Sequence, residues 1–162
     1  MNKVYLLIGG NMGDRLANIQ HAQSLIAQKV GTIVQCSSIF ETEAWGLKEQ
    51  APFLNQAIEL ATHLEAPELL VQLQAIEQSL GRVRTQYLGP RTMDIDIIYF
   101  NDAIIHTHDL QIPHPHIQDR NFVLSPLVEL APTYRHPQLG LTNQELLAVC
   151  KDVSAVYKKI GR

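Results

Sequence analysis

The chain has 162 residues, of which 46% are hydrophobic and 18% are charged, and its formal net charge is −3. This composition is typical of one globular domain, 1–162, with a sizeable core, and it argues against an intrinsically disordered chain. The weakly acidic balance excludes a broad basic surface for nucleic acid or an anionic membrane, and no apolar run approaches the roughly 18–20 residues of a membrane span.

The first half of the chain alternates between predicted strands and helices. Residues 3–9 form a short apolar run that ends in glycine, which predicts a buried strand. Apolar residues at helical spacing predict a helix over 14–29. We expect one strand over 32–42 and a loop over 43–52. The mostly alternating pattern of 53–62 predicts another strand, although its alanines are also compatible with a helix.

A second helix and a further strand complete the predicted core. Residues 66–81 have a proline near the first turn, end in glycine and carry one apolar stripe, so they predict a helix. A loop over 82–90 precedes a strand over 92–100. The order β-α-β-β-α-β is that of an α+β ferredoxin-like fold, in which we expect the helices to cover one face of an antiparallel sheet.

The C-terminal third is expected to extend this core. Prolines punctuate 110–124, which predicts mostly irregular structure, and 125–132 is typical of a short helical turn. One or two helices are predicted over 142–159. Cys36 and Cys150 are far apart and lack a CxxC pattern, which indicates reduced thiols in a cytoplasmic protein.

Two aspartates open the strand at 92–100, in the segment GPRTMDIDIIYF. Because side chains alternate along a strand, Asp94 and Asp96 should project from one face, together with Ile98 and Phe100 farther along. Two neighbouring carboxylates repel each other, and a bound cation removes this repulsion. Oxygen ligands favour Mg²⁺, which usually takes one or two carboxylates with phosphate oxygens and water. The alternative is that the pair is only the solvated edge of a strand.

Arginines gather around these aspartates in the sequence. Arg82, Arg84 and Arg91 precede them, and Arg120 follows. Guanidinium groups beside metal-binding carboxylates suit a polyphosphate that is held from both sides, although the arginines could also simply neutralise the pair. The chain has no P-loop, since GGNMGDR lacks the GxxxxGK[ST] pattern. A nucleotide would therefore be bound without the commonest phosphate-binding loop.

A histidine pair, His114 and His116, flanks Pro115. Neither a CxxC nor an HExxH motif accompanies the pair, so we do not expect a structural zinc site. A single imidazole that donates a hydrogen bond to a phosphate is the preferred interpretation.

Four motifs follow one another along the chain: GGN with GD after the first strand, FLNQA over 53–57, GRVR followed by GPRTMDIDIIYF over 81–100, and PHPHIQDRNFVLSPL over 113–127. With these motifs in this order, the chain resembles the 6-hydroxymethyl-7,8-dihydropterin pyrophosphokinase family of folate biosynthesis from about residue 4 to 130. The most specific match is the segment over 81–100. The resemblance implies that pyrophosphate is transferred from ATP to the hydroxymethyl group of the pterin and that AMP is released.

The resemblance also implies roles for individual residues. Two Mg²⁺ ions would be bound by Asp94 and Asp96. The co-substrate ATP would be bound by Gln74, Glu77, Arg82, Arg84, Arg91, Ile97, His114 and Arg120. The pterin would be bound by Thr42, Trp45, Phe53, Asn55 and Phe122, with its ring between the two phenylalanines. Arg82 and Arg91 would act in catalysis together with Asp96, which is the candidate to accept the hydroxyl proton.

Two other classes of protein stay open as alternatives. Another Mg²⁺-dependent nucleotide enzyme on a ferredoxin-like sheet would keep the paired aspartates but would not need Asn55 between aromatic partners. A non-catalytic regulatory domain of similar topology would lack the aspartate pair and the arginine cluster. For the preferred interpretation we expect a monomer with no nucleic-acid or membrane partner. Loops 43–52 and 82–91 should close over the site and exclude water.

Overall fold

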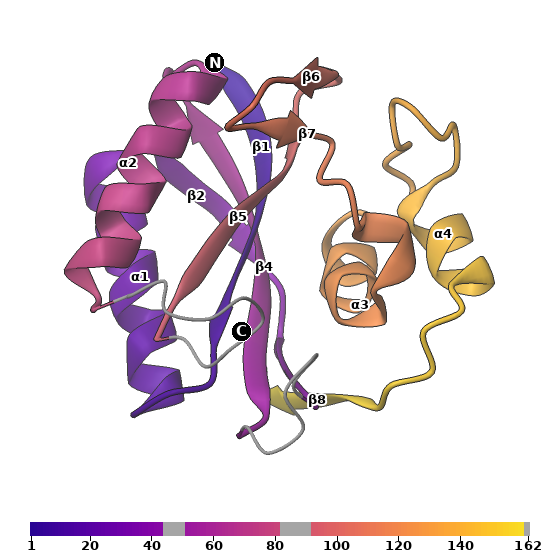
Figure 1. The fold of residues 1–162 in the computed structure, drawn as a ribbon, viewed down its shortest axis with the longest axis horizontal. Coiled ribbons are helices and arrows are strands. Elements are labelled where there is room, and N and C mark those ends of the chain that lie inside the picture. The colour runs from indigo at the N-terminus through magenta and orange to yellow at the C-terminus, as the bar shows by residue number, and fades with distance from the viewer. Residues whose placement is uncertain (44–50, 82–91, 161–162) are drawn as a thin grey trace.

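A six-stranded antiparallel sheet forms the centre of the computed structural model, which describes residues 1–43, 51–81 and 92–160 (Figure 1). The strands lie in the order β5 (Asp94–Phe100), β1 (Asn2–Gly10), β4 (Phe53–Thr62), β3 (Ile39–Thr42) and β8 (Val156–Ile160), and β2 (Thr32–Cys36) also pairs with β4. A separate short ladder joins β6 (Ile105–His106) to β7 (Gln111–Ile112). The strands predicted over 3–9, 53–62 and 92–100 are confirmed.

Helices cover both faces of this sheet (Figure 1). α1 (Arg15–Lys29) and α2 (Ala66–Ser79) pack on one face, and α3 (Asn121–Leu130) and α4 (Asn143–Val149) pack on the other. The predicted helices over 14–29 and 66–81 are confirmed, and the elements up to β5 follow the α+β ferredoxin-like order, except that two strands, β2 and β3, stand in the place of one. The two helices of the predicted core cover one face as expected, and the C-terminal helices α3 and α4 cover the other face as well.

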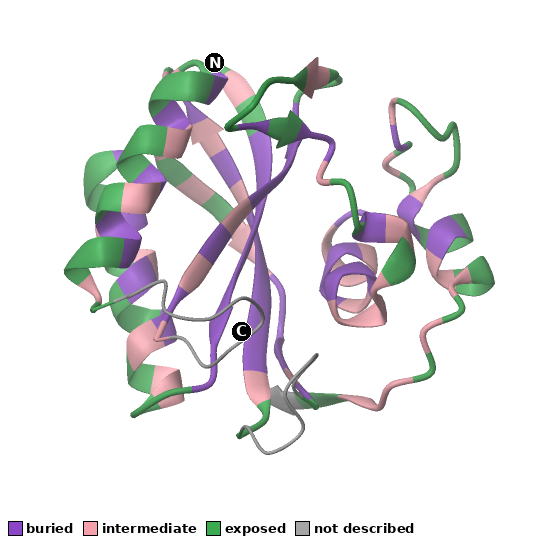
Figure 2. Ribbon diagram, in the orientation of Figure 1, coloured by how far each residue is buried: buried purple, intermediate pink, exposed green. Residues whose placement is uncertain are grey.

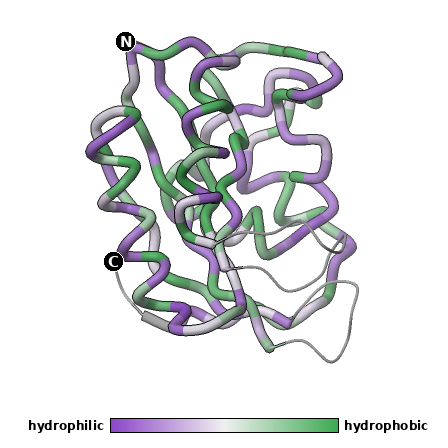
Figure 3. Tube along the Cα trace, turned by 60° about the vertical axis from the view of Figure 1, so that its left-hand side comes forward, coloured by the Kyte–Doolittle hydropathy of each residue, from purple (hydrophilic) through white to green (hydrophobic). Residues whose placement is uncertain are grey.

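The alternation of side chains along β1 explains why both faces need a cover. Val4, Leu6 and Ile8 point into the core with α1 and α2. Tyr5 and Leu7 point into a second core with α3 and α4. All five are buried, and β1 is buried along most of its length in Figure 2. Hydrophobic and hydrophilic residues are interspersed along the chain in Figure 3. Hydrophobic residues of α1 and α2 recur at helical spacing and are buried against the sheet, for example Ile19 and Ile26 on α1 and Leu69 and Leu73 on α2.

The segment predicted as one strand over 32–42 is two strands, because Ser37 and Ser38 interrupt the ladder with β4. The Ser37 N–H still donates to the Ala57 carbonyl oxygen, but the Ser37 hydroxyl, instead of a backbone carbonyl, accepts the Ala57 N–H, with both bonds at 2.9 Å. Ser38 donates its N–H and its hydroxyl to the carboxylate of Glu129 on α3. The interruption therefore connects the sheet to α3.

The C-terminal third contains more regular structure than its sequence predicts. α3 begins at Asn121, inside the stretch 110–124 that is expected to be irregular, and it continues through Pro126 to Leu130. A 3-10 turn, Ile117–Asp119, precedes it. Within the predicted helical region 142–159, α4 ends at Val149 and the last part is β8, which pairs with β3. The second helix allowed by the prediction is thus a strand.

The predicted loops 43–52 and 82–90 fall largely on residues 44–50 and 82–91, which lie outside the described residues. Within the ranges that the structure describes, no helix combines the length and hydropathy that crossing a membrane requires.

Candidate active site

A pocket lies at one end of the sheet, where β1 and β3 end and β4 and β5 begin. The strand register brings these ends together, since Gly9 pairs with both Asn55 and Asp94, and Thr42 pairs with Phe53. The start of α3 adds a further side. The lining residues are Leu7, Gly9, Thr42, Glu43, Phe53, Asn55, Asp94, Asp96, Arg120 and Phe122. Segments from distant parts of the sequence thus converge on one cavity.

Asp94 and Asp96 both line this pocket and are half-buried. Ile95 lies between them and points into the core on the opposite face. The shared orientation of the two carboxylates agrees with the alternation expected of a strand. It places two acidic side chains side by side at the mouth of β5.

The alternation of side chains between the two faces of the sheet changes farther along β5. Tyr5 pairs with Tyr99, but the next residue of β1, Leu6, pairs with Ile97, so the register leaves Ile98 as the extra residue of a bulge. Ile98 and Tyr99 consequently both point into the α3 side of the sheet, and Phe100 points to the α1 side. The expectation that Phe100 shares the aspartate face is therefore wrong, because Tyr99 takes that place.

Thr42, Phe53, Asn55 and Phe122, four of the expected pterin-binding residues, all line the pocket. Asn55 is only 6% exposed although its side chain is a carboxamide. Gly9 makes this possible, since a Cβ atom on Gly9 would lie 2.3 Å from the Asn55 Oδ1 atom. In the sequence, Gly9 is only the last residue of the predicted strand 3–9. The pairing of β1 with β4 is the signal that identifies its role beside Asn55.

Arg120 brings positive charge to the pocket. It directly precedes α3, and its guanidinium carbon lies 5.9 Å from the centroid of the Phe122 ring. At this distance the cation and the ring face attract each other. The pocket thus combines the carboxylate pair of Asp94 and Asp96, the further carboxylate of Glu43, a guanidinium group and two phenylalanine rings.

His114 lies near this charge cluster but lines a second cavity, together with Pro113, Pro115 and His136 among others. The pKa of His114 is lowered from 6.5 to about 4, mainly by burial and also by the charges of Arg120 and His116, whereas the charge of Asp94 acts in the opposite direction. The imidazole is therefore neutral near pH 7. Its Nδ1 atom accepts a hydrogen bond from the His116 N–H at 3.2 Å. The ring proton is thus on Nε2, which can donate to a ligand.

Three other expected ATP-binding residues are described, and none of them lines the pocket: Gln74, Glu77 and Ile97. Glu77 is buried on α2, and its Oε2 atom accepts a hydrogen bond from the Ile95 N–H at 2.7 Å. The side chain of Ile97 is part of the core beneath α1 and α2. Gln74 is half-buried on α2. The remaining expected site residues lie outside the described residues: Trp45, Arg82, Arg84 and Arg91.

The donor set of the pocket fits a cation that brings ligands of its own. Among the residues that the structure describes, no group of three or more histidine, cysteine, aspartate or glutamate side chains is arranged to hold a metal ion. Asp94 and Asp96 supply two carboxylates. Mg²⁺ commonly takes one or two carboxylates and completes its coordination with phosphate oxygens and water. The pair therefore fits Mg²⁺ bound together with a nucleoside triphosphate.

Comparison with known families identifies the chain. The model of the 7,8-dihydro-6-hydroxymethylpterin-pyrophosphokinase (HPPK) family matches residues 5–132. The chain belongs to this family. It is 41% identical over 157 residues to the 2-amino-4-hydroxy-6-hydroxymethyldihydropteridine pyrophosphokinase of Bacillus subtilis, a match that covers 96% of this chain and 94% of that protein. The enzyme of the same name from Synechocystis sp. is 42% identical, with 93% and 76% covered. The resemblance that the sequence motifs indicate is confirmed.

Some HPPK relatives are much longer. The folic acid synthesis protein FOL1 of Dictyostelium discoideum is 41% identical over 145 residues, and the match spans 22% of its length. The crystal structure of wild-type Plasmodium falciparum HPPK-DHPS with SDX-DHP superimposes with a TM-score of 0.75 at 18% identity, covering 91% of this chain and 43% of that one. This likeness supports the α+β fold of the HPPK family.

Proposed function

We propose that the pocket beside Asp94 and Asp96 is the place where this pyrophosphokinase of folate biosynthesis joins its two substrates. In the proposed reaction, the hydroxymethyl oxygen of 6-hydroxymethyl-7,8-dihydropterin attacks the β-phosphorus of ATP. The bond from that phosphorus to the α–β bridging oxygen breaks, and AMP leaves. The proposal is carried by one observation, that a carboxylate pair, a guanidinium group, a carboxamide and two phenylalanine rings line one cavity.

The pterin is proposed to bind between Phe53 and Phe122, because a flat heterocycle packs favourably against aromatic faces. The carboxamide of Asn55 offers both a donor and an acceptor to the edge of the ring. Thr42 lies beside Phe53 in the ladder and lines the same side of the pocket. These residues would leave the hydroxymethyl group directed toward the aspartates.

The triphosphate is proposed to lie between the aspartates and the basic residues. Asp94 and Asp96 would hold Mg²⁺, which when bound neutralises charge on the phosphate oxygens. Arg120 supplies a planar donor for phosphate, and His114 supplies a neutral Nε2–H. Arg82, Arg84 and Arg91 remain proposed phosphate ligands. Gln74 and the backbone of Ile97 are proposed to contact the nucleoside, whereas Glu77 would act through its bond to β5.

Asp96 is proposed to accept the proton of the attacking hydroxyl group. Its carboxylate lines the pocket in which the pterin residues also lie, so it can reach a hydroxymethyl group there. Loss of this carboxylate removes both the proton acceptor and one Mg²⁺ ligand. Transition-state stabilisation should suffer more than ground-state binding.

The test is AMP formation from ATP and Mg²⁺, measured with and without the pterin alcohol. We expect AMP only with the pterin, and Asp96→Ala should reduce kcat by roughly a thousandfold. A melting curve checks that the variant is folded. Asp102→Ala, in the exposed turn at the opposite end of β5, is the control and should retain full activity. Pyrophosphate release in place of AMP would support the alternative nucleotide enzyme, and an active Asp96→Ala variant would contradict the metal assignment.

A further inference from the structure

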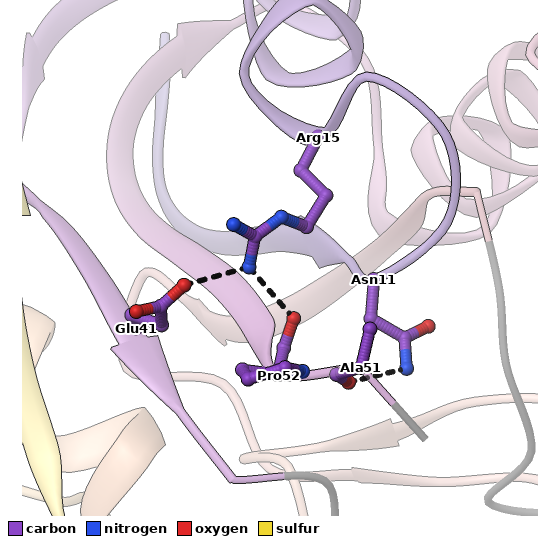
Figure 4. Close-up of polar contacts among 5 residues, drawn as sticks. All are labelled: Asn11, Arg15, Glu41, Ala51 and Pro52. Carbon is purple, nitrogen blue, oxygen red and sulfur yellow. Dashed lines mark hydrogen bonds and ion pairs between the residues drawn. The ribbon is translucent and has the colours of Figure 1, made fainter.

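Arg15 holds together two chain segments that carry lining residues of the pocket (Figure 4). It lies at the start of α1, and its Nη1 atom donates to the Glu41 Oε2 atom at 2.7 Å and to the Pro52 carbonyl oxygen at 3.0 Å. Glu41 directly precedes Thr42, and Pro52 directly precedes Phe53. One guanidinium group therefore contacts the neighbour of each of two proposed pterin-binding residues.

A second contact fixes the same segment. The Asn11 side-chain N–H donates to the Ala51 carbonyl oxygen at 2.9 Å (Figure 4). Asn11 follows β1 and is only 5% exposed. The ladder between β3 and β4 begins at the pair of Thr42 and Phe53, so Ala51 and Pro52 lie just outside it. Hydrogen bonds from Asn11 and Arg15 thus take the place of ladder bonds at this entry to β4.

Arg15 acts from the side of the sheet that faces away from the pocket. Thr42 lines the pocket, and Glu41, its neighbour on β3, must point to the opposite face because side chains alternate along a strand. Arg15 is not among the pocket-lining residues. Any effect of Arg15 on the substrate must therefore pass through the backbone of β3 and of Ala51–Pro52.

We infer that Arg15 is a positioning residue for the pterin, which sets the spacing between Thr42 and Phe53 through its bonds to Glu41 and to the Pro52 carbonyl. This inference rests on the proposed pterin site. A planar guanidinium group can direct two donors at two fixed acceptors, whereas an ammonium group is a point charge on a flexible stem. The side chains of Arg15 and Glu41 are 27% and 23% exposed, so solvent weakens the ion pair and its effect on global stability should be small.

The test separates the KM for the pterin from the KM for ATP. Arg15→Ala should raise the pterin KM about tenfold, the scale of one charge-assisted hydrogen bond, and should leave the ATP KM within about twofold. Arg15→Lys should recover part of the loss. Glu41→Gln keeps an acceptor for Arg15 and should fall between Arg15→Ala and the unsubstituted enzyme. Melting curves check that each variant is folded.

A matched ion pair far from the pocket provides the control. Arg135 lies 3.8 Å from Glu145, and Arg135→Ala should change neither KM. Asn55→Ala tests the pterin site itself and should raise the pterin KM. If Asn55→Ala has no effect, the proposed pterin site is wrong. Two other results would show that the positioning role is wrong. In the first, Asn55→Ala weakens pterin binding but Arg15→Ala does not. In the second, Arg15→Ala raises both KM values equally and lowers the melting temperature.

Discussion

The carboxylate of Glu77 accepts a hydrogen bond from the backbone N–H of Ile95 at 2.7 Å. Ile95 stands between Asp94 and Asp96, which line the pocket on the opposite face of the sheet. Glu77 is 5% exposed, so this charge-assisted bond is shielded from solvent. The helix α2 therefore fixes the part of β5 from which both aspartates project.

Replacement of Glu77 should affect both stability and turnover. Glu77→Ala leaves the buried Ile95 N–H without this acceptor and should lower the free energy of unfolding by about 2 kcal/mol. It should also lower kcat, because β5 can shift beneath the aspartates. Glu77→Gln retains an acceptor oxygen and should therefore retain most of the stability and most of the kcat. Urea unfolding and AMP formation measure the two effects.

Glu68→Ala provides a control for Glu77, since Glu68 is an exposed carboxylate in the first turn of the same helix. We expect it to have little effect on either quantity. A Glu77→Ala variant with lowered stability but unchanged kcat would show that the bond supports the fold without positioning the aspartates.

Gly9 should be required for the position of Asn55. A Cβ atom at residue 9 would lie 2.3 Å from both the Asn55 Oδ1 atom and the Leu54 carbonyl oxygen. Gly9→Ala must therefore displace the carboxamide and strain the ladder, and should cost roughly 1–3 kcal/mol of stability. The KM for the pterin should rise. In an Asn55→Ala background the same substitution should have a much smaller effect on that KM, which a double-mutant cycle measures.

The sequence predicts the orientation of side chains where a single strand is sufficient to determine it. Asp94 and Asp96 share a face because alternation is a property of a single strand. The orientation of Phe100 could not be predicted in this way, because the bulge at Ile98 depends on how β5 pairs with β1. The strand β8 was likewise not predictable, since its partner β3 lies far earlier in the chain.

The same reasoning explains what was missed in the candidate site. The aromatic residues, Asn55 and the aspartates belong to motifs and could be proposed from the sequence. Arg15 was not proposed, because in the sequence it is an ordinary residue at the start of a helix. Its partners, Glu41 and the Pro52 carbonyl, become neighbours only when the sheet forms. Positioning contacts between distant segments therefore require the structure.

The contact between Glu129 and Ser38 should stabilise the attachment of α3 to the sheet. The Glu129 Oε1 atom accepts bonds from the Ser38 hydroxyl at 2.7 Å and from the Ser38 N–H at 3.1 Å. Glu129→Ala should lower the free energy of unfolding by about 1–2 kcal/mol, and Glu129→Gln by less, because its oxygen can still accept. Chemical unfolding measures both. Equal losses in the two variants would show that the charge, and not the accepted bonds, is responsible.

His136 should make the stability of the protein depend on pH. The residue is 3% exposed, and its Nδ1 atom accepts the N–H groups of Gln138 and Leu139 at 3.1 and 2.9 Å. Burial lowers its pKa from 6.5. As the pH falls through 6.5, His136 therefore takes up a proton in the unfolded chain, whereas in the folded protein it does so only at lower pH. The contribution of His136 to stability is fully present above pH 6.5. As the pH falls below 6.5, this one site should lower the free energy of unfolding by at most about 1.4 kcal/mol per pH unit.

A substitution that cannot titrate isolates this contribution from that of His114, whose pKa is lowered to about 4 and which acts in the same direction. His136→Asn keeps an acceptor oxygen near the two N–H groups but binds no proton in this range. Urea unfolding at pH 7.5 and 5.5, where most carboxylates remain ionised, should show a smaller loss of stability in the variant than in the unsubstituted protein. Because only the difference between the two pH values is compared, a general destabilisation of the variant does not affect the result. An equal loss in both proteins would mean that His136 takes up its proton as readily in the folded state as in the unfolded chain.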